Sequence, residues 1–224
     1  MTRPLSSIME SQPQHLKTDE THSDAQGTGD FCTASVCSMC SVVSYNMHGF
    51  NQGCHTVRDL ILSCKSTAPD VFLLQEHWLT PANLSKFEQE FPQYICFGSS
   101  AMSSCVESGV IRGRPFGGVM TLVHKSLSKC SKVICASDRF VVVVVGDLLI
   151  VNVYMPSSGT PNRLDIFEEV LSNVLSWLQT YPTHRVVLGG DINCDLDDVS
   201  PVSGLFKHFA DDTGLLRCDQ LSLS

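Results

Sequence analysis

The sequence predicts a mixed α/β fold in which helices lie outside β-sheets. Three observations support this prediction: strand and helix patterns alternate early in the chain, four strand patterns follow one another in the middle, and a strand–helix–strand order returns near the end. A chain of 224 residues is long enough to bury a sizeable core. This order of elements is typical of sheets whose outer faces are covered by helices.

The first elements follow a change from polar to apolar composition near residue 40. In chain order we expect a strand at 41–46, a helix at 55–65, a strand at 71–76, a helix at 81–91 and a strand at 93–99. Val57, Leu60, Ile61 and Cys64 recur at helical spacing, which indicates one apolar face. The strand VFLLQE is almost continuously apolar, so we expect it to be covered on both faces.

The later elements follow a polar, glycine-rich stretch at 99–117. In chain order we expect strands at 118–125, 131–137, 139–146 and 147–156, a helix at 162–181, a strand at 185–190 and a helix at 203–215. The pair Gly146-Asp147 predicts a hairpin turn between two of these strands. One apolar stripe marks the helix at 162–181, formed by Leu164, Phe167, Leu171, Val174, Leu175 and Leu178.

The first 38 residues differ in composition from the rest of the chain. They contain mostly Ser, Thr, Gln, Pro, Asp and His, which predicts a disordered leader at 1–38 followed by one domain at 39–224. The leader lacks the apolar stretch of a signal peptide, and no apolar run approaches the ~20 residues of a membrane span. We therefore expect a protein that is intracellular, in nucleus or cytoplasm, and does not enter the membrane.

The cysteine count and the net charge limit the kinds of protein that this chain can be. Without a signal peptide, we expect the eleven cysteines to be reduced and partly buried, and Cys37-Ser-Met-Cys40 lacks a second pair at zinc spacing. A formal net charge of −8 argues against a basic protein that coats DNA. This charge is compatible with an enzyme that holds a cation in an acidic pocket and contacts a nucleic acid locally.

Polar side chains end four of the expected strands. These are Asn46, Glu76, Tyr154 and Asp191, with Asn193 two residues after Asp191. If the last strand continues, Asp191 and Asn193 point to the same face. Each residue also has a simpler interpretation, since Glu76 could be a solvated strand end and Tyr154 a rim aromatic. The acids that follow Asn193 at 195, 197 and 198 are typical of a solvated loop.

Such a set of side chains supports hydrolysis at phosphorus. Mg²⁺ takes oxygen ligands and usually only one or two protein carboxylates. A second carboxylate can orient or deprotonate the attacking water, and neutral amide or phenol groups can hold phosphate oxygens. The sequence contains neither a GxxxxGK nor a GxGxxG phosphate-binding loop.

Five motifs in order resemble the endonuclease/exonuclease/phosphatase superfamily, and most of all the apurinic-type endonuclease domains of non-LTR retrotransposons. They are SYNMHGF, LLQEHWL, GRPFGGV, VNVYMPS and GGDINCD, and they span roughly residues 41–200. The resemblance implies a four-layer α/β/β/α sandwich with two packed sheets. It also implies a Mg²⁺- or Mn²⁺-dependent endonuclease that nicks DNA, with a reverse transcriptase domain downstream in a full-length protein.

The resemblance also implies a role for each strand-end residue. Glu76 would be the main metal ligand with Asn46 beside it, and Asp191 would position or activate the water. Asn193 would stabilise the phosphorane-like transition state, and Tyr154 would contact the scissile phosphate. Arg112 and Arg114 could contact a nucleic-acid backbone, or equally form a salt-bridged surface loop. The sequence carries no signal for the oligomeric state.

Two departures from the family pattern affect these expectations. His48 stands where many members have Asp. The family also ends on an Asp-His pair, whereas the last histidine here is His208, within a helix pattern. We therefore expect a domain that stops before its last strands and is weakly active or inactive. The alternatives are a phosphatase or phosphodiesterase acting on a lipid or RNA, and an inactive truncated remnant.

Overall fold

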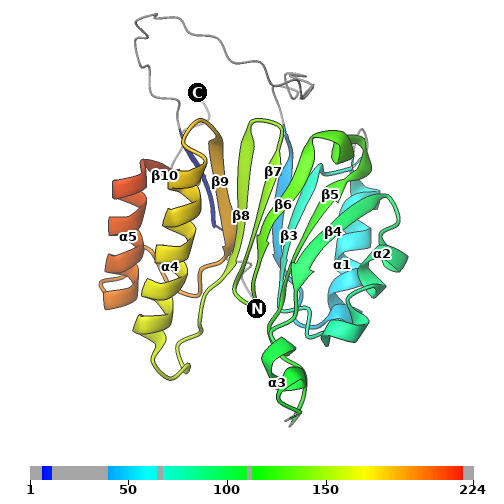
Figure 1. Cartoon of the computed structure of the whole chain (residues 1–224), viewed down its shortest axis with the longest axis horizontal. Helices are drawn as coiled ribbons and strands as arrows, with labels where there is room; N and C mark the ends of the chain where they lie inside the picture. The colour runs from blue at the N-terminus through cyan, green and yellow to red at the C-terminus, as the bar shows by residue number, and fades with distance from the viewer. Residues whose placement is uncertain (1–6, 12–39, 65–67, 110–112, 219–224) are drawn as a thin grey trace, which may run out of the picture.

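Two β-sheets pack face to face in the computed structural model, which describes residues 7–11, 40–64, 68–109 and 113–218. Helices cover the outer side of each sheet, so the layers run helix, sheet, sheet, helix (Figure 1). This arrangement confirms the predicted α/β class and its four-layer sandwich. None of the helices among these residues has the length and apolarity needed to cross a membrane.

The smaller sheet is formed by the early part of the chain. Its strands lie in the order β2 (Val42–Asn46), β3 (Val71–Gln75), β5 (Val119–His124) and β4 (Tyr94–Ser99). β2 and β3 are parallel and joined through α1 (Phe50–Ser63), which lies on the outer face with η1 (Pro81–Asn83) and α2 (Lys86–Glu90). All five residues of β3 are buried, which confirms a strand covered on both faces.

The larger sheet is formed mainly by the later part of the chain. Its strands lie in the order β10 (Leu215–Arg217), β1 (Ser7–Ser11), β9 (Arg185–Asp191), β8 (Leu148–Tyr154), β7 (Phe140–Val145) and β6 (Ser131–Ala136). β7 and β8 form the expected hairpin through Gly146-Asp147. α4 (Arg163–Thr180) joins β8 to the parallel β9, and α5 (Pro201–Thr213) packs beside α4.

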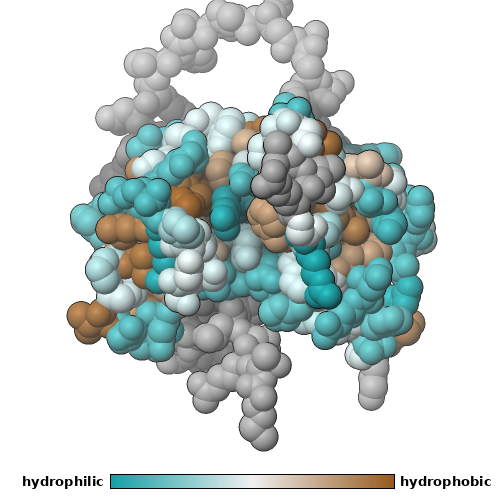
Figure 2. Space-filling model, turned by 90° about the horizontal axis from the view of Figure 1, so that it is seen from below, coloured by the Kyte–Doolittle hydropathy of each residue, from teal (hydrophilic) through white to brown (hydrophobic). Residues whose placement is uncertain are grey.

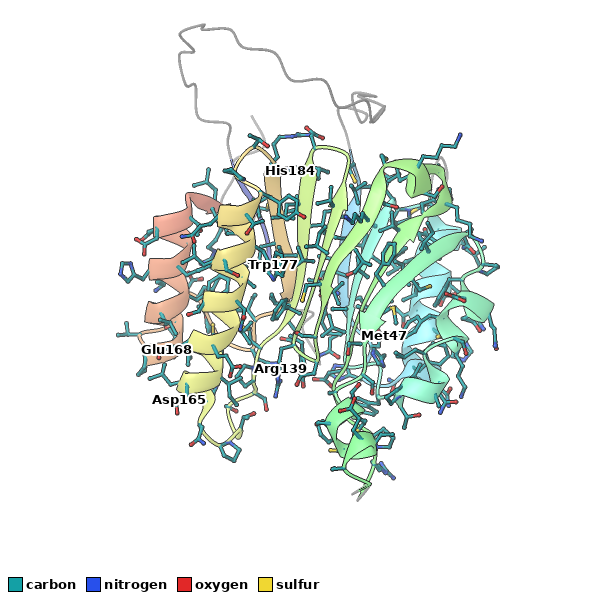
Figure 3. The ribbon with its side chains drawn as sticks, viewed as in Figure 1. Met47, Arg139, Asp165, Glu168, Trp177 and His184 are labelled. Atoms are coloured by element: carbon teal, nitrogen blue, oxygen red, sulfur yellow. The ribbon has the colours of Figure 1, made fainter. Side chains whose placement is uncertain are left out.

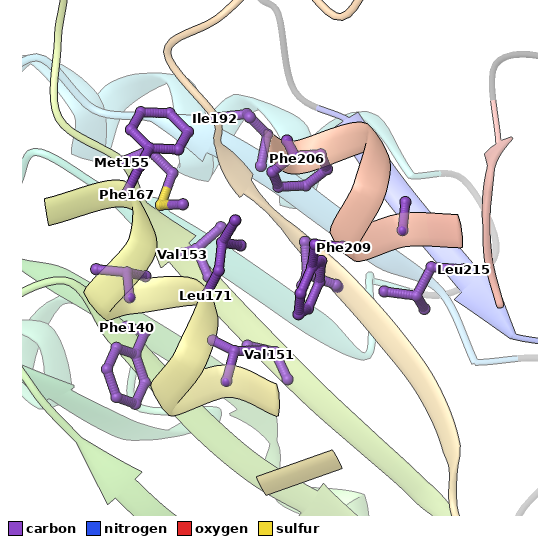
Figure 4. Packing of buried hydrophobic residues seen from close by; sticks show 14 of the residues in the cluster. Phe140, Val151, Val153, Met155, Phe167, Leu171, Ile192, Phe206, Phe209 and Leu215 are labelled. Atoms are coloured by element: carbon purple, nitrogen blue, oxygen red, sulfur yellow. The ribbon is translucent and has the colours of Figure 1, made fainter. Parts of the chain in front are cut away.

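Apolar side chains fill the space between the layers. Figure 4 shows the cluster between α4, α5 and the larger sheet, where Phe167 and Leu171 lie with Val151 and Val153. Each such side chain contributes about 1.5–3 kcal/mol when fully buried. Leu164 begins the predicted stripe of α4 but is 39% exposed, because it lies in the first turn, beyond this cluster.

The helices differ from the sequence predictions in their bounds and in their number. α1 begins at Phe50, five residues early, and its Gly53 lies directly against the Met47 side chain. Glycine disfavours helices intrinsically, so packing sets this boundary. The helix expected at 81–91 is divided into η1 and α2. Short helices α3 (Ser103–Glu107) and η2 (Lys125–Cys130) were not predicted, since each is too short to show a period.

The leader expected to be disordered contains one strand. β1 at residues 7–11 lies between β9 and β10 and is antiparallel to both. The backbone N–H and C=O groups along the edge of β9 are paired by this strand, and such pairing does not require a strong strand pattern in the sequence. The other leader residues lie outside the described part of the chain, so the boundary at residue 38 stays a prediction.

Candidate active site

The strand ends that the sequence singles out meet at one end of the sandwich. β2 and β3 are parallel, and so are β8 and β9, so each pair brings its carboxyl ends to the same edge. In the β8–β9 register Tyr154 lies directly opposite Asp191. Met47 and Arg139 mark this end at the lower side of Figure 3. Figure 2 views the molecule from this side and shows hydrophilic residues lying between hydrophobic ones.

Two hydrogen bonds join the sheets across this end. Asn46 Nδ2, on the smaller sheet, donates to Asp191 Oδ2 on the larger sheet at 2.7 Å. The Tyr154 hydroxyl, on the larger sheet, donates to Glu76 Oε1 just after β3 at 3.0 Å. The structure therefore brings four of the five predicted strand-end residues into direct contact in pairs, from positions far apart in the chain.

Asp191 is held in a fixed orientation. Its Oδ1 accepts from the Asn193 backbone N–H at 3.1 Å, while Oδ2 accepts from Asn46. Burial raises the pKa of Asp191, and the hydrogen bonds from Asn46 and Asn193 oppose this shift. A carboxylate of raised basicity in a fixed orientation suits the task of accepting a proton from water.

Glu76 is held by the backbone around it. Its N–H donates to the Gly118 carbonyl at 2.9 Å, and its carbonyl accepts from the Gly49 N–H at 2.8 Å. Its Oε2 lies 3.6 Å from His48 Nδ1, and 18% of its side chain is exposed. Glu76 is therefore rigidly placed while its carboxylate remains reachable from solvent.

Tyr154 lies between a carboxylate and a guanidinium. Arg139 Cζ lies 5.3 Å from the Tyr154 ring centroid, and the Tyr154 N–H donates to the Arg139 carbonyl at 2.7 Å. Burial and then the charge of Glu76 raise the pKa of Tyr154, so the phenol stays protonated and can act as a donor.

Arg139 is a further candidate site residue, which the sequence analysis did not identify. The hairpin register gives a signal that could have found it. Val145 pairs with Leu148 across the turn, and the same register continued by six residues places Arg139 opposite Tyr154. Its positive charge at the site makes it a candidate for binding a phosphate oxygen.

Asn193 departs from the predicted geometry. β9 ends at Asp191, and Asn193 has φ 51°, so the strand does not continue and the two side chains do not share a strand face. Its Nδ2 donates to the Met155 carbonyl at 2.8 Å. Arg163 donates to the carbonyls of both Asn193 and Pro156, and so connects the loops that follow β8 and β9.

The remaining charged candidates lie away from these contacts. Asp195, Asp197 and Asp198 are exposed, and Asp197 pairs with Arg217 at 2.7 Å, as expected for a solvated loop. Arg114 is exposed in the loop before β5, and Arg112 lies outside the described residues. His208 is on α5, 3.5 Å from Asp212 and 76% exposed.

The oxygen-bearing side chains at this edge suit a hard cation that takes only some of its ligands from the protein. In the part of the chain that the structure describes, no group of three or more His, Cys, Asp and Glu residues could hold a metal ion. Mg²⁺ needs only one or two carboxylates and keeps waters for substrate oxygens. The Glu76 carboxylate, with the Asn46 amide oxygen on the neighbouring strand, fits this requirement.

Comparisons with known proteins give the family. A model of the Endonuclease/Exonuclease/phosphatase family matches residues 43–212, well over half of the chain. No curated protein matches. Among solved structures, the chain is similar to the 3′ phosphatase NExo from Neisseria bound to product DNA hairpin, at 16% identity and a TM-score of 0.55, covering 77% of this chain and 71% of that one.

Two AP endonucleases are also similar in fold. The enzyme from Archaeoglobus fulgidus is 14% identical with a TM-score of 0.54, covering 77% of this chain and 70% of that one. The LMAP enzyme from Leishmania major is 15% identical with a TM-score of 0.56, covering 78% and 66%. The chain belongs to the Endonuclease/Exonuclease/phosphatase family.

Proposed function

We propose that this chain is a metal-dependent phosphodiester hydrolase and, more specifically, a DNA endonuclease of the retrotransposon type. The observation that carries the proposal is the pair of cross-sheet hydrogen bonds, Asn46 to Asp191 and Tyr154 to Glu76. They gather two carboxylates, an amide and a phenol at one edge, and this is the chemistry that hydrolysis at phosphorus needs. Family membership supports the general reaction.

In the proposed reaction each side chain has one task. Glu76 and Asn46 would hold a divalent cation, which would supply positive charge to polarise a phosphoryl oxygen and stabilise the leaving oxygen. Asp191 orients and deprotonates the attacking water, for which its raised pKa is suited. The protonated Tyr154 hydroxyl donates to a phosphate oxygen, and Asn193 stabilises the charge of the transition state.

DNA is proposed as the substrate for two reasons. Solved structures that are similar in fold include a 3′ phosphatase bound to a DNA hairpin and two AP endonucleases. The motif GRPFGGV also resembles the corresponding motif of retrotransposon endonucleases. In those proteins the endonuclease domain nicks DNA for a reverse transcriptase domain of the same chain. Arg114, exposed in that motif, is proposed to contact the DNA backbone.

The test compares three substrates in Mg²⁺ and in EDTA. We expect supercoiled plasmid to be nicked slowly in Mg²⁺ and left intact in EDTA, with little release of phosphate from phosphoinositide vesicles or cleavage of single-stranded RNA. Glu76→Gln, which keeps the shape of the side chain, is expected to abolish nicking. Hydrolysis of lipid or RNA in preference to DNA would assign the site to the alternative substrates. No hydrolysis of any substrate would overturn the proposed activity.

A further inference from the structure

Two exposed aromatic rings lie beside the candidate active site and take no part in the chemistry above. Trp78 is 38% exposed and Phe116 is 53% exposed. In the described part of the chain, no other Trp, Phe or Tyr side chain is exposed. Trp78 lies in the loop after β3, two residues beyond Glu76, and Phe116 lies in the loop before β5.

Backbone contacts place the two rings on neighbouring segments. The Trp78 N–H donates to the Gly117 carbonyl at 3.0 Å, one residue after Phe116. This bond and the one from the Glu76 N–H to Gly118 continue the antiparallel β3–β5 pairing beyond the sheet. The backbones of Trp78 and Phe116 therefore lie on neighbouring segments, two residues along the chain from Glu76 in the case of Trp78.

The indole of Trp78 is kept outside the core by its backbone. Trp78 has φ 54°, a left-handed conformation that is unusual for a bulky residue. Gly49 makes room for the ring, because a Cβ atom there would lie 2.7 Å from Trp78 Cε3. Strained residues of this kind cluster at active sites and ligand-binding segments, which makes Trp78 a candidate binding residue.

The overall charge of the protein favours a base rather than a phosphate as the ligand of these rings. At a net charge of −8, phosphate neutralisation provides little affinity for nucleic acid. Stacking of a base on an aromatic ring does not depend on positive charge and accepts any base. Bases inside a duplex are already stacked, so such a platform selects nucleotides that are unpaired or turned out of the helix.

We propose that Trp78 and Phe116 form a stacking platform for an unpaired base next to the scissile phosphate, so that the substrate is DNA with a single-stranded or opened segment. This inference rests on the proposed function and adds the substrate class. It assigns the aromatic loops a role in binding, while Glu76 and Asp191 carry out hydrolysis.

Fluorescence tests the platform directly, because the chain has two tryptophans. Trp177→Phe leaves Trp78 as the sole indole, and Trp177 lies on α4 among core residues. We expect oligothymidylate to quench Trp78 in EDTA, where no cleavage occurs. An abasic oligonucleotide of the same length and charge should bind roughly 5- to 150-fold more weakly, the range expected for the loss of one stacked base.

Substitutions separate stacking from general apolar contact. Phe116→Ala should weaken oligothymidylate binding by a similar factor. Leu62→Ala is the control, because it removes an apolar side chain that is 80% exposed at the other end of α1, and it should leave oligothymidylate binding unchanged.

Equal binding of abasic and base-containing strands would overturn the platform, and so would a dimer dissociated by Phe116→Ala. If quenching depends on bases but no DNA is hydrolysed, the proposed function fails and the platform stands. If nicking occurs without base-dependent quenching, only the platform fails.

Discussion

Left-handed backbone conformations concentrate at the candidate active site. Outside glycine, the described residues with positive φ are His48, Glu76, Trp78, Asn162 and Asn193. All except Asn162 lie in the loops that follow β2, β3 and β9. Each such residue carries on the order of 1–3 kcal/mol of strain, which persists only where neighbouring contacts fix it. The site residues therefore have set positions before any ligand binds.

His77 makes the stability of this region dependent on pH. Its side chain is fully buried, Nδ1 accepts from the Leu79 N–H at 3.0 Å, and Nε2 lies 3.1 Å from the Ser99 carbonyl. These partners require the neutral ring with its proton on Nε2. Burial lowers the pKa of His77 from 6.5 to about 4.

We predict that stability falls as the pH drops from 6.5 towards 4. In this window the unfolded chain binds a proton at His77 that the folded chain does not, so the contribution of the neutral ring is complete above pH 6.5 and is lost on acidification. The loss is on the order of 3 kcal/mol. His77→Gln can make both hydrogen bonds without titrating, so its urea midpoint should fall less steeply over this range. Parallel pH profiles for the two proteins would contradict this account.

At the scale of single elements, Gly190 controls how closely β8 and β9 approach. It has φ 137°, and a Cβ atom there would lie 2.0 Å from the Val153 carbonyl oxygen, which is backbone and cannot rotate away. The next residue is Asp191, so the spacing of these strands also sets the position of the site carboxylate.

Gly190→Ala is predicted to destabilise the protein by about 3 kcal/mol or more, because the two strands must separate. Gly204→Ala is the matched control. Gly204 lies in α5, and a methyl group added there would have no atom within 4 Å, so alanine should raise the free energy of unfolding by roughly 0.5–1 kcal/mol. Chemical denaturation of both variants measures the difference. Similar effects at the two glycines would show that the β8–β9 approach is not tight.

Elements with a clear period or turn signal could be predicted from the sequence. The Gly146-Asp147 turn predicts the β7–β8 hairpin, and the stripe on α4 predicts its buried face. The helix at 81–91 could not be placed correctly, because the chain uses two short helices there whose ends depend on packing. β1 could not be predicted either, since it forms by backbone pairing with β9 from a distant part of the chain.

At the scale of the whole molecule, a cluster of buried hydrogen bonds joins the two sheets beneath the site. Gln75 Nε2 on β3 donates to Asn152 Oδ1 on β8 at 2.7 Å, and Asn152 Nδ2 donates to the Met120 carbonyl at 3.1 Å. Both side chains are buried in an interface otherwise made largely of apolar residues. Gln75 precedes Glu76 and Asn152 is two residues before Tyr154, so this cluster aligns the sheets where the site residues meet.

Asn152→Leu is predicted to lower the free energy of unfolding by about 1–3 kcal/mol, because it leaves the Gln75 amide and the Met120 carbonyl without this partner. Replacing Gln75 with Met in the same protein should recover part of that loss. Urea unfolding of the two single variants and the double variant gives the coupling energy. A coupling energy of zero would show that the two residues stabilise the protein independently.

The sequence could predict the composition of the site more fully than its arrangement. The five strand-end residues are recognisable from the motifs, and four of them are paired across the sheets. Which residue contacts which depends on how one sheet lies on the other, and no local pattern encodes this. The orientation of Asn193 could not be predicted for a related reason, because its left-handed conformation turns the chain away from the strand direction.

The most direct test of the account is the initial rate at which the chain nicks supercoiled plasmid in Mg²⁺, compared between the native sequence and Asp191→Asn. A single cleavage relaxes the whole circle, so the assay detects even a slow enzyme. If Asp191 deprotonates the attacking water, the variant should be slower by roughly 10²–10⁴-fold at an unchanged thermal unfolding midpoint. Equal rates for the two folded proteins would contradict the central claim that this edge of the sandwich is a hydrolytic site.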